Sequence, residues 1–112
     1  MCTKTQLNRI TQQISQYYYS VYGDNIVAIY LYGSYAREDF DEESDIDITA
    51  IVKGNRIDLQ DKLKKIWDVS ADIGLENDVI ISPTVIPFTE YEQYKYVLPY
   101  YISIWKEGKR IG

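Results

Sequence analysis

The chain of 112 residues is 46% hydrophobic and 26% charged, which is the composition of one globular domain rather than of a disordered segment. Its net charge of −5 disfavours binding to nucleic acid or to an anionic membrane, and the lack of histidine excludes histidine zinc sites and histidine-activated nucleophiles. Cys2 has no partner for an internal disulfide, and neither a membrane span nor a signal peptide is evident, so we expect a cytoplasmic protein.

The first part of the chain predicts a helix, a strand and a loop. Apolar residues at helical spacing predict a helix over about residues 4–22 that stops at Gly23. The run Ile26–Tyr32 is rich in β-branched and aromatic residues, which favours a buried central strand that ends at the Gly33–Ser34 pair. Residues 35–43 are expected to form a short helical turn and an acidic loop.

The middle of the chain predicts two further strands and a helix. Alternation at the start of Asp45–Val52 predicts a strand, and helical spacing predicts a helix over Ile57–Ile73 that Gly74 closes. Asn77–Ile81 is expected to be a third short strand. The two prolines of Ser82–Pro87 limit that stretch to a sheet edge or a loop.

A last helix is predicted over Glu90–Glu107, with a capping box formed by Thr89 and Glu92 and a bend or break near Pro99. Three strands interleaved with helices predict an α/β fold, in which helices flank a small sheet that is either mixed or parallel. We expect a single domain over residues 1–112.

The aromatic residues divide between core and surface. Trp67 and Trp105 are expected in the core. Three consecutive helical positions span about 200°, so at least one residue of Tyr17–Tyr19 should be exposed. A second group of tyrosines lies within residues 91–101. Either group could form a protein interface, where tyrosine is enriched, or the edge of the core.

Two aspartates stand at the beginning of the second predicted strand. In Asp45-Ile46-Asp47-Ile48 the residues alternate, so both carboxylates should lie on one sheet face and both isoleucines on the other. Neighbouring carboxylates repel each other unless a cation lies between them. At a separation within about 7 Å they could share one or two divalent ions, and hard oxygen ligands select Mg²⁺ or Mn²⁺. The alternative is that they are only surface acids.

Three further features surround the aspartates in the predicted fold. Asp78 could complete the cluster from the third predicted strand, with Glu76 as a rival acid. The Gly33–Ser34 pair lies between a strand and a helical turn, where backbone amides bind anions, although Ser34 could simply cap the turn. Arg37 could neutralise a phosphate or pair with a nearby acid. An anion site beside a two-metal site is typical of phosphoryl-type transfer from a nucleotide.

The Gly33–Ser34 pair, ten intervening residues and then Asp45-Ile46-Asp47 resemble the signature of the DNA polymerase β-like nucleotidyltransferase superfamily. The strings GSYAR and SDIDI and the small size are similar to its minimal nucleotidyltransferase branch, whose members are typically antitoxins paired with HEPN-domain toxins. The resemblance covers the whole chain in element order and implies that superfamily's fold. Glu38 departs from the pattern, because relatives often have glycine there.

The resemblance also implies a role for each matching residue. Gly33 and Ser34 would hold the β- and γ-phosphates of ATP. Asp45 and Asp47 would bind two Mg²⁺ ions, and Asp78 would be the third catalytic carboxylate and metal ligand. The implied reaction transfers AMP to a tyrosine hydroxyl of a cognate HEPN toxin, and the implied assembly is a hetero-oligomer with that toxin.

Two other functions stay open. The first is an antitoxin of the same fold that neutralises the toxin by binding alone, which three converging carboxylates would argue against. The second is a nucleotidyltransferase for small molecules such as aminoglycosides, although 112 residues leave little room for an acceptor site of that kind.

Overall fold

A four-stranded sheet in the order β3-β2-β1-β4 lies at the centre of the computed structural model, which describes residues 3–41 and 44–112. Strand β2 is parallel to β3 and antiparallel to β1, and β1 is antiparallel to β4, so the sheet is mixed. In chain order the elements are α1 (Lys4–Tyr22), a 3₁₀ turn (Gly23–Asn25), β1 (Ile26–Tyr32), α2 (Ser34–Arg37), β2 (Ile46–Val52), α3 (Arg56–Asn77), β3 (Ile81–Pro87), α4 (Phe88–Tyr94), α5 (Pro99–Glu107) and β4 (Lys109–Arg110).

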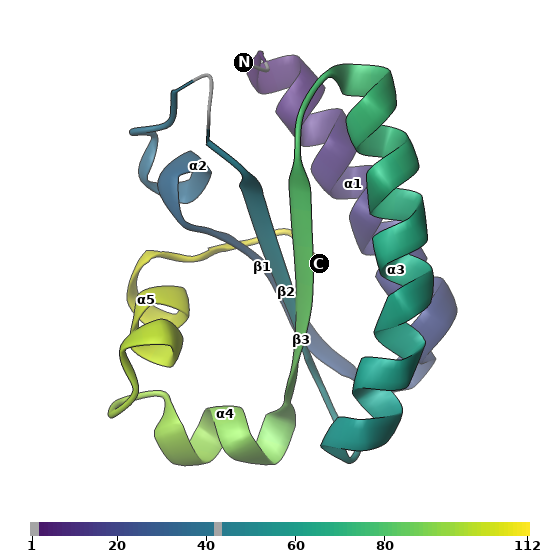
Figure 1. Ribbon diagram of the computed structural model, residues 1–112. Helices are drawn as coiled ribbons and strands as arrows, with labels where there is room; N and C mark the ends of the chain where they lie inside the picture. Colours follow the sequence, from purple (N-terminus) through teal and green to yellow (C-terminus); the bar gives the residue numbers. More distant parts are fainter. Residues whose placement is uncertain (1–2, 42–43) are drawn as a thin grey trace.

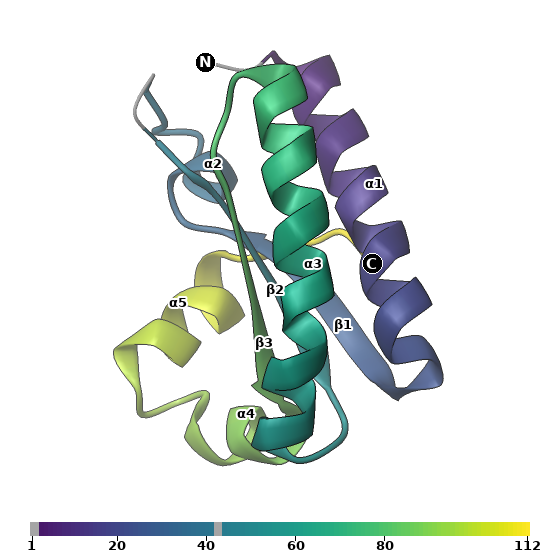
Figure 2. The same ribbon diagram turned by 45° about the vertical axis from the view of Figure 1, so that its right-hand side comes forward.

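Helices cover both faces of this sheet. The long helices α1 and α3 lie side by side on one face, and the short helices α4 and α5 lie on the other (Figure 1). Figure 2 shows the same separation after a turn of the molecule. No helix in the described part of the chain is both long and apolar enough to cross a membrane.

The long helices begin where the sequence supplies a cap. Thr3 accepts a hydrogen bond from the amide of Gln6, whose side chain accepts one from the Thr3 amide, which makes a capping box. Asn55 caps α3 by accepting from the amide of Asp58. Both helices then bury an apolar face against the sheet.

The larger core lies between the sheet and the α1–α3 pair. It takes alternate residues of the strands, including Ile46, Ile48 and Val85, together with Ile10 and Ile14 of α1. A smaller core under α4 and α5 takes the residues that point the other way. Its buried members are Ile51, Ile86, Tyr91, Tyr101 and Ile104.

The third strand and the end of α3 differ from the prediction. The strand is Ile81–Pro87, so the prediction of a strand over residues 77–81 was wrong, whereas the prediction of a sheet edge for the proline-containing stretch is confirmed. Gly74 does not end α3. A Cβ there would lie 2.6 Å from the carbonyl oxygen of Val79, so glycine lets the returning chain pass close to the helix. The helix ends instead at Asn77, and the following Asp78 has the left-handed conformation that caps it.

The last predicted helix is broken, as expected, into α4 and α5, with Pro99 in the first turn of α5. The capping box at Thr89 was wrong, because α4 begins at Phe88, two residues before the predicted start at Glu90, and has no side-chain cap. Trp67 and Trp105 are 49% and 47% exposed, so their assignment to the core was wrong as well. Trp67 lies on α3 and Trp105 on α5, and neither indole belongs to the buried side of its helix.

The tyrosines of α1 follow the prediction. Tyr17 and Tyr19 are each 44% exposed, whereas Tyr18 is fully buried and donates a hydrogen bond of 2.7 Å to the carbonyl oxygen of Thr84. The second tyrosine group also has exposed members. The exposed large apolar side chains of residues 94–105 are Tyr94, Tyr96, Val97, Leu98, Tyr100 and Trp105.

Candidate active site

The aspartate pair lies where β2 begins, on the face of the sheet that carries α4 and α5. Ile46 and Ile48 are fully buried in the α1–α3 core, and the half-buried Asp47 between them therefore faces the other way. Asp45 precedes the strand, and its neighbour Ile46 is held by a hydrogen bond of 2.8 Å to the carbonyl oxygen of Ile80. The predicted alternation is confirmed for Ile46, Asp47 and Ile48.

The two carboxylates interact. Burial raises the pKa of Asp47 above its usual range, and the negative charge of Asp45 raises it further, whereas Arg37 opposes both effects. A divalent cation would relieve this repulsion, and carboxylate oxygens are ligands that Mg²⁺ prefers.

Gly33 lies against Asp47. The preceding residue, Tyr32, pairs with Asp47 across β1 and β2. The φ of Gly33 is 75°, and a Cβ there would lie 2.5 Å from Oδ2 of Asp47. Glycine is required twice at this position, once for the backbone conformation and once for the space that the carboxylate fills.

Ser34 is the first residue of α2. The helix is capped by Gly33, whose carbonyl oxygen accepts hydrogen bonds of 3.1 Å from the amides of Ala36 and Arg37. Ser34 is therefore not the cap, and its half-buried hydroxyl makes no hydrogen bond to another residue within 3–41 or 44–112. This hydroxyl can therefore bind a ligand without breaking an existing bond.

Arg37 pairs with acids, which is one of its two predicted roles. Its guanidinium lies 3.1 Å from Asp39 and 3.3 Å from Glu107, and these carboxylates hold the pKa of Arg37 above its usual value. Glu38 has a φ of 64°, a left-handed conformation that suits glycine better, which accounts physically for the glycine expected at this position.

Asp78 is not on a strand. It is exposed at the end of α3, where its amide donates to the carbonyl oxygen of Gly74. Within the described ranges, no three His, Cys, Asp or Glu side chains gather where they could hold a metal ion, so Asp78 does not join Asp45 and Asp47 in such a cluster. The strand position paired with Asp47 belongs to Ser82. Its hydroxyl is a neutral oxygen at the place where a third carboxylate on this strand would stand.

Residues 12–95, three quarters of the chain, match the family described as "Polymerase beta, Nucleotidyltransferase". The chain belongs to this family. The nucleotidyltransferase also shares 40% identity over 62 residues with a protein of Methanocaldococcus jannaschii named "Putative protein adenylyltransferase MJ0141". That match covers 55% of this chain and 61% of the relative, so the chain spans about three fifths of the relative's length.

Solved structures show the same fold. A toxin-antitoxin with AMP-PNP matches 88% of this nucleotidyltransferase and 70% of its own chain, with a TM-score of 0.51 and 16% identity. A chain named "putative nucleotidyltransferase from Sulfolobus solfataricus" matches 96% of this chain and 82% of its own, with a TM-score of 0.56 and 19% identity. At these identities the likeness establishes the architecture alone, and the α/β fold with flanking helices expected from the sequence is confirmed, with the mixed sheet as one of the two arrangements left open there.

A tyrosine network borders the aspartates of the nucleotidyltransferase. The hydroxyl of Tyr100 lies 2.9 Å from that of Tyr32 and 3.0 Å from the hydroxyl of Thr84. Burial and the bond to Tyr100 raise the pKa of Tyr32, and the charge of Asp47 adds to this. The sequence carried no signal for this network, because its members lie on β1, β3 and α5 and meet only when the sheet forms.

Proposed function

We propose that this nucleotidyltransferase is a Mg²⁺-dependent protein adenylyltransferase that moves AMP from ATP to a tyrosine hydroxyl of a cognate HEPN-domain toxin and so acts as its antitoxin. The observation that carries the proposal is the contact of Asp47 with Gly33, which joins a pair of carboxylates to a glycine-led turn. The names of the Methanocaldococcus relative and of the toxin-antitoxin structure support it.

Each residue of the site has a part in the proposed reaction. The Gly33–Ser34 turn binds the β- and γ-phosphates, for which the Ser34 hydroxyl is available. Asp45 and Asp47 hold Mg²⁺, which supplies positive charge to the triphosphate when bound. The acceptor oxygen forms a bond to the α-phosphorus, the bond to the bridging oxygen breaks, pyrophosphate leaves and the phenolic proton passes to water. Arg37 exchanges Asp39 and Glu107 for a phosphate oxygen.

The test is transfer of label from ATP labelled on the α-phosphate, with Mg²⁺ and with or without a HEPN protein encoded beside this one. Label and one AMP of added mass should appear on the HEPN protein and vanish in the Asp45→Asn/Asp47→Asn variant. Asp68→Asn/Asp72→Asn is the matched control, since both aspartates are exposed on the outer side of α3. Absence of label with the native protein would contradict adenylyl transfer.

A non-catalytic antitoxin is the second candidate, and one observation favours it. The argument from three converging carboxylates has no support among the described residues, where Asp45 acts on Asp47, no third acid joins them in a group that could hold a metal ion, and Ser82 pairs with Asp47. Suppression of the toxin by the doubly substituted protein, with no label transferred by the native one, would support this candidate instead.

A further inference from the structure

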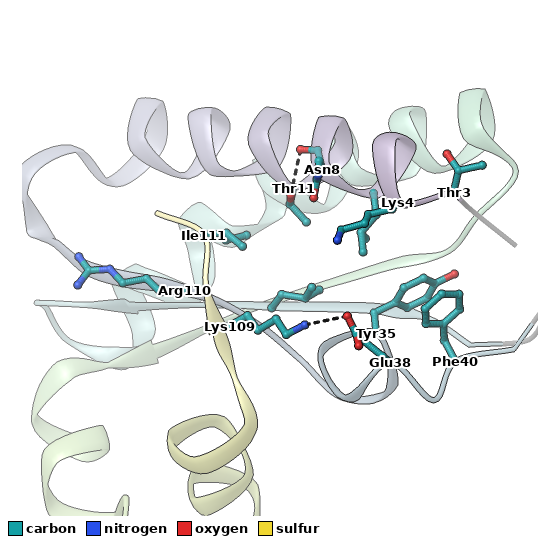
Figure 3. Close-up of a pocket in the computed structure, with 12 residues that line it drawn as sticks. Thr3, Lys4, Asn8, Thr11, Tyr35, Glu38, Phe40, Lys109, Arg110 and Ile111 are labelled. Atoms are coloured by element: carbon teal, nitrogen blue, oxygen red, sulfur yellow. Dashed lines mark hydrogen bonds and ion pairs between the residues drawn. The ribbon is translucent and has the colours of Figure 1, made fainter.

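We propose that a pocket between α1 and the loop after α2 binds an organic anion that has an apolar body and a single carboxylate or phosphate head. The pocket has a volume of about 510 Å³, which is within the range of small-molecule sites. It lies between the first turns of α1, residues 35–40 and the strand β4 (Figure 3). None of the candidate active-site residues Gly33, Ser34, Asp45 and Asp47 lines it.

The walls of this pocket are mostly apolar. Leu7 of α1, Leu31 of β1 and Ile111 contribute aliphatic side chains. Tyr35 and Phe40 stack on each other with ring centres 4.3 Å apart and planes 9° from parallel, and they form an aromatic wall after α2. An apolar body placed here would bury its surface and gain free energy in proportion to that area.

The charges around the opening select an anion. Three basic residues and one acid line the pocket, in a chain whose net charge is −5. Lys109 is paired with Glu38 at 3.4 Å, and Arg110 is turned toward the carbonyl oxygens of Gly112 and Val27. Lys4 forms no ion pair with another residue of the described ranges. Figure 3 shows its side chain reaching from α1 into the space opposite the Lys109–Glu38 pair.

One uncommitted lysine sets the class of ligand. A triphosphate would need several hydrogen-bond donors, whereas Lys4 and Lys109 are enough for a single carboxylate or phosphate. Lys109 can leave Glu38 for the ligand, because their ion pair is exposed and therefore weak. The polar residue Thr11 already donates to the carbonyl oxygen of Asn8 at 3.0 Å, so the remainder of the lining favours an apolar body.

The experiment is calorimetric titration of the protein, without ATP, with dodecanoate, dodecyl phosphate and dodecyltrimethylammonium below micelle-forming concentrations. Saturable binding of one or both anions at one per chain is expected, and their ratio identifies the preferred head. Lys4→Met should weaken that binding about tenfold, the loss of one charge-assisted contact. Lys4→Arg should retain it, and Lys65→Met on the exposed side of α3 should leave it unchanged.

Three results would overturn the proposal. The first is that neither anion binds saturably. The second is that dodecyltrimethylammonium binds as tightly as the anions, and the third is that Lys4→Met and Lys65→Met bind the anions with equal affinity. Circular dichroism of each variant shows whether it is folded. Because the titration contains no nucleotide, its outcome is independent of whether adenylyl transfer is found.

Discussion

A carboxylate oxygen of Asp47 occupies the space that a side chain on Gly33 would need. The distance from that oxygen to a Cβ built on Gly33 would be 2.5 Å, which is closer than a real Cβ approaches any atom. The turn that precedes α2 and the acid of β2 are therefore fitted to each other, although they are fourteen positions apart in the sequence.

Gly33→Ala tests this fit. We expect adenylyl transfer to fall at least tenfold, because the methyl group displaces Asp47 from the Gly33–Ser34 turn, and we expect destabilisation of about 1–3 kcal/mol from the positive φ and the clash. Gly23→Ala is the matched control, since Gly23 has a φ of 61° and no atom within 4 Å of its Cβ position. It shares the backbone strain and should keep full activity. Equal loss of activity in both variants would show that strain alone is responsible.

Asp47→Asn should stabilise the protein in the absence of metal. Burial and Asp45 raise the pKa of Asp47, so the folded protein binds this proton more tightly than the unfolded chain and loses stability as the pH rises through that interval. The variant escapes this loss, so its advantage should appear as the pH increases above about 4 and reach less than about 1 kcal/mol at pH 7, because the group is partly exposed.

Urea unfolding of both proteins between pH 4 and pH 7.5 measures this difference. Addition of Mg²⁺ should reverse the order, since the native protein gains a ligand and the variant does not. A constant difference at all pH values would contradict the assigned role of the charge.

Ser82→Asp tests whether an acid at position 82 could act as a third metal ligand beside Asp45 and Asp47. Ser82 pairs with Asp47 in the parallel ladder, so an aspartate there would add a carboxylate on the same side of the neighbouring strand. We expect affinity for Mg²⁺ to rise about tenfold and stability without metal to fall, because a third negative charge joins two others. Ser20→Asp, exposed on α1, serves as the control in the same metal titration. Unchanged affinity would show that the Ser82 position does not face the ion.

Gly74→Ala should destabilise the protein by about 1–3 kcal/mol, although alanine is the better helix former by about 1 kcal/mol. The added methyl would meet the carbonyl oxygen of Val79, whose amide donates to the carbonyl of Gly74 at 3.0 Å. Thermal unfolding measures the change. A more stable variant would mean that the chain after α3 can move away without cost.

Local patterns were sufficient for most of the fold. The helix over residues 4–22 and the strand Ile26–Tyr32 could be read from apolar spacing because each buries one continuous face. The alternation of residues along the strand was enough to predict that Asp47 lies on the sheet face opposite to Ile46 and Ile48. Such signals lie within one element and do not depend on what packs against it.

The errors arose where a distant contact overrides a local preference. Gly74 has the appearance of a helix stop, and only the passage of Val79 beside it explains a glycine inside α3. Asp78 was therefore assigned to a strand that begins three residues later. The pairing of Ser82 with Asp47 and the hydroxyl contact between Tyr32 and Tyr100 depend on register and docking, which no short pattern encodes.

The two edge strands of the sheet, β3 and β4, are poor templates for pairing with a further strand. The carbonyl oxygen of Ile80 accepts a hydrogen bond from β2, so the backbone groups of every second residue from Ile81 onward point away from β2. Pro83 and Pro87 are among these residues, and proline has no amide hydrogen to donate to another strand. At the opposite margin, β4 consists of two basic residues. Among the described residues, β3 lacks two outward amides and β4 offers only two residues, so we expect the protein to resist edge-to-edge pairing, and the proposed protein acceptor would be recognised through side chains rather than through backbone pairing.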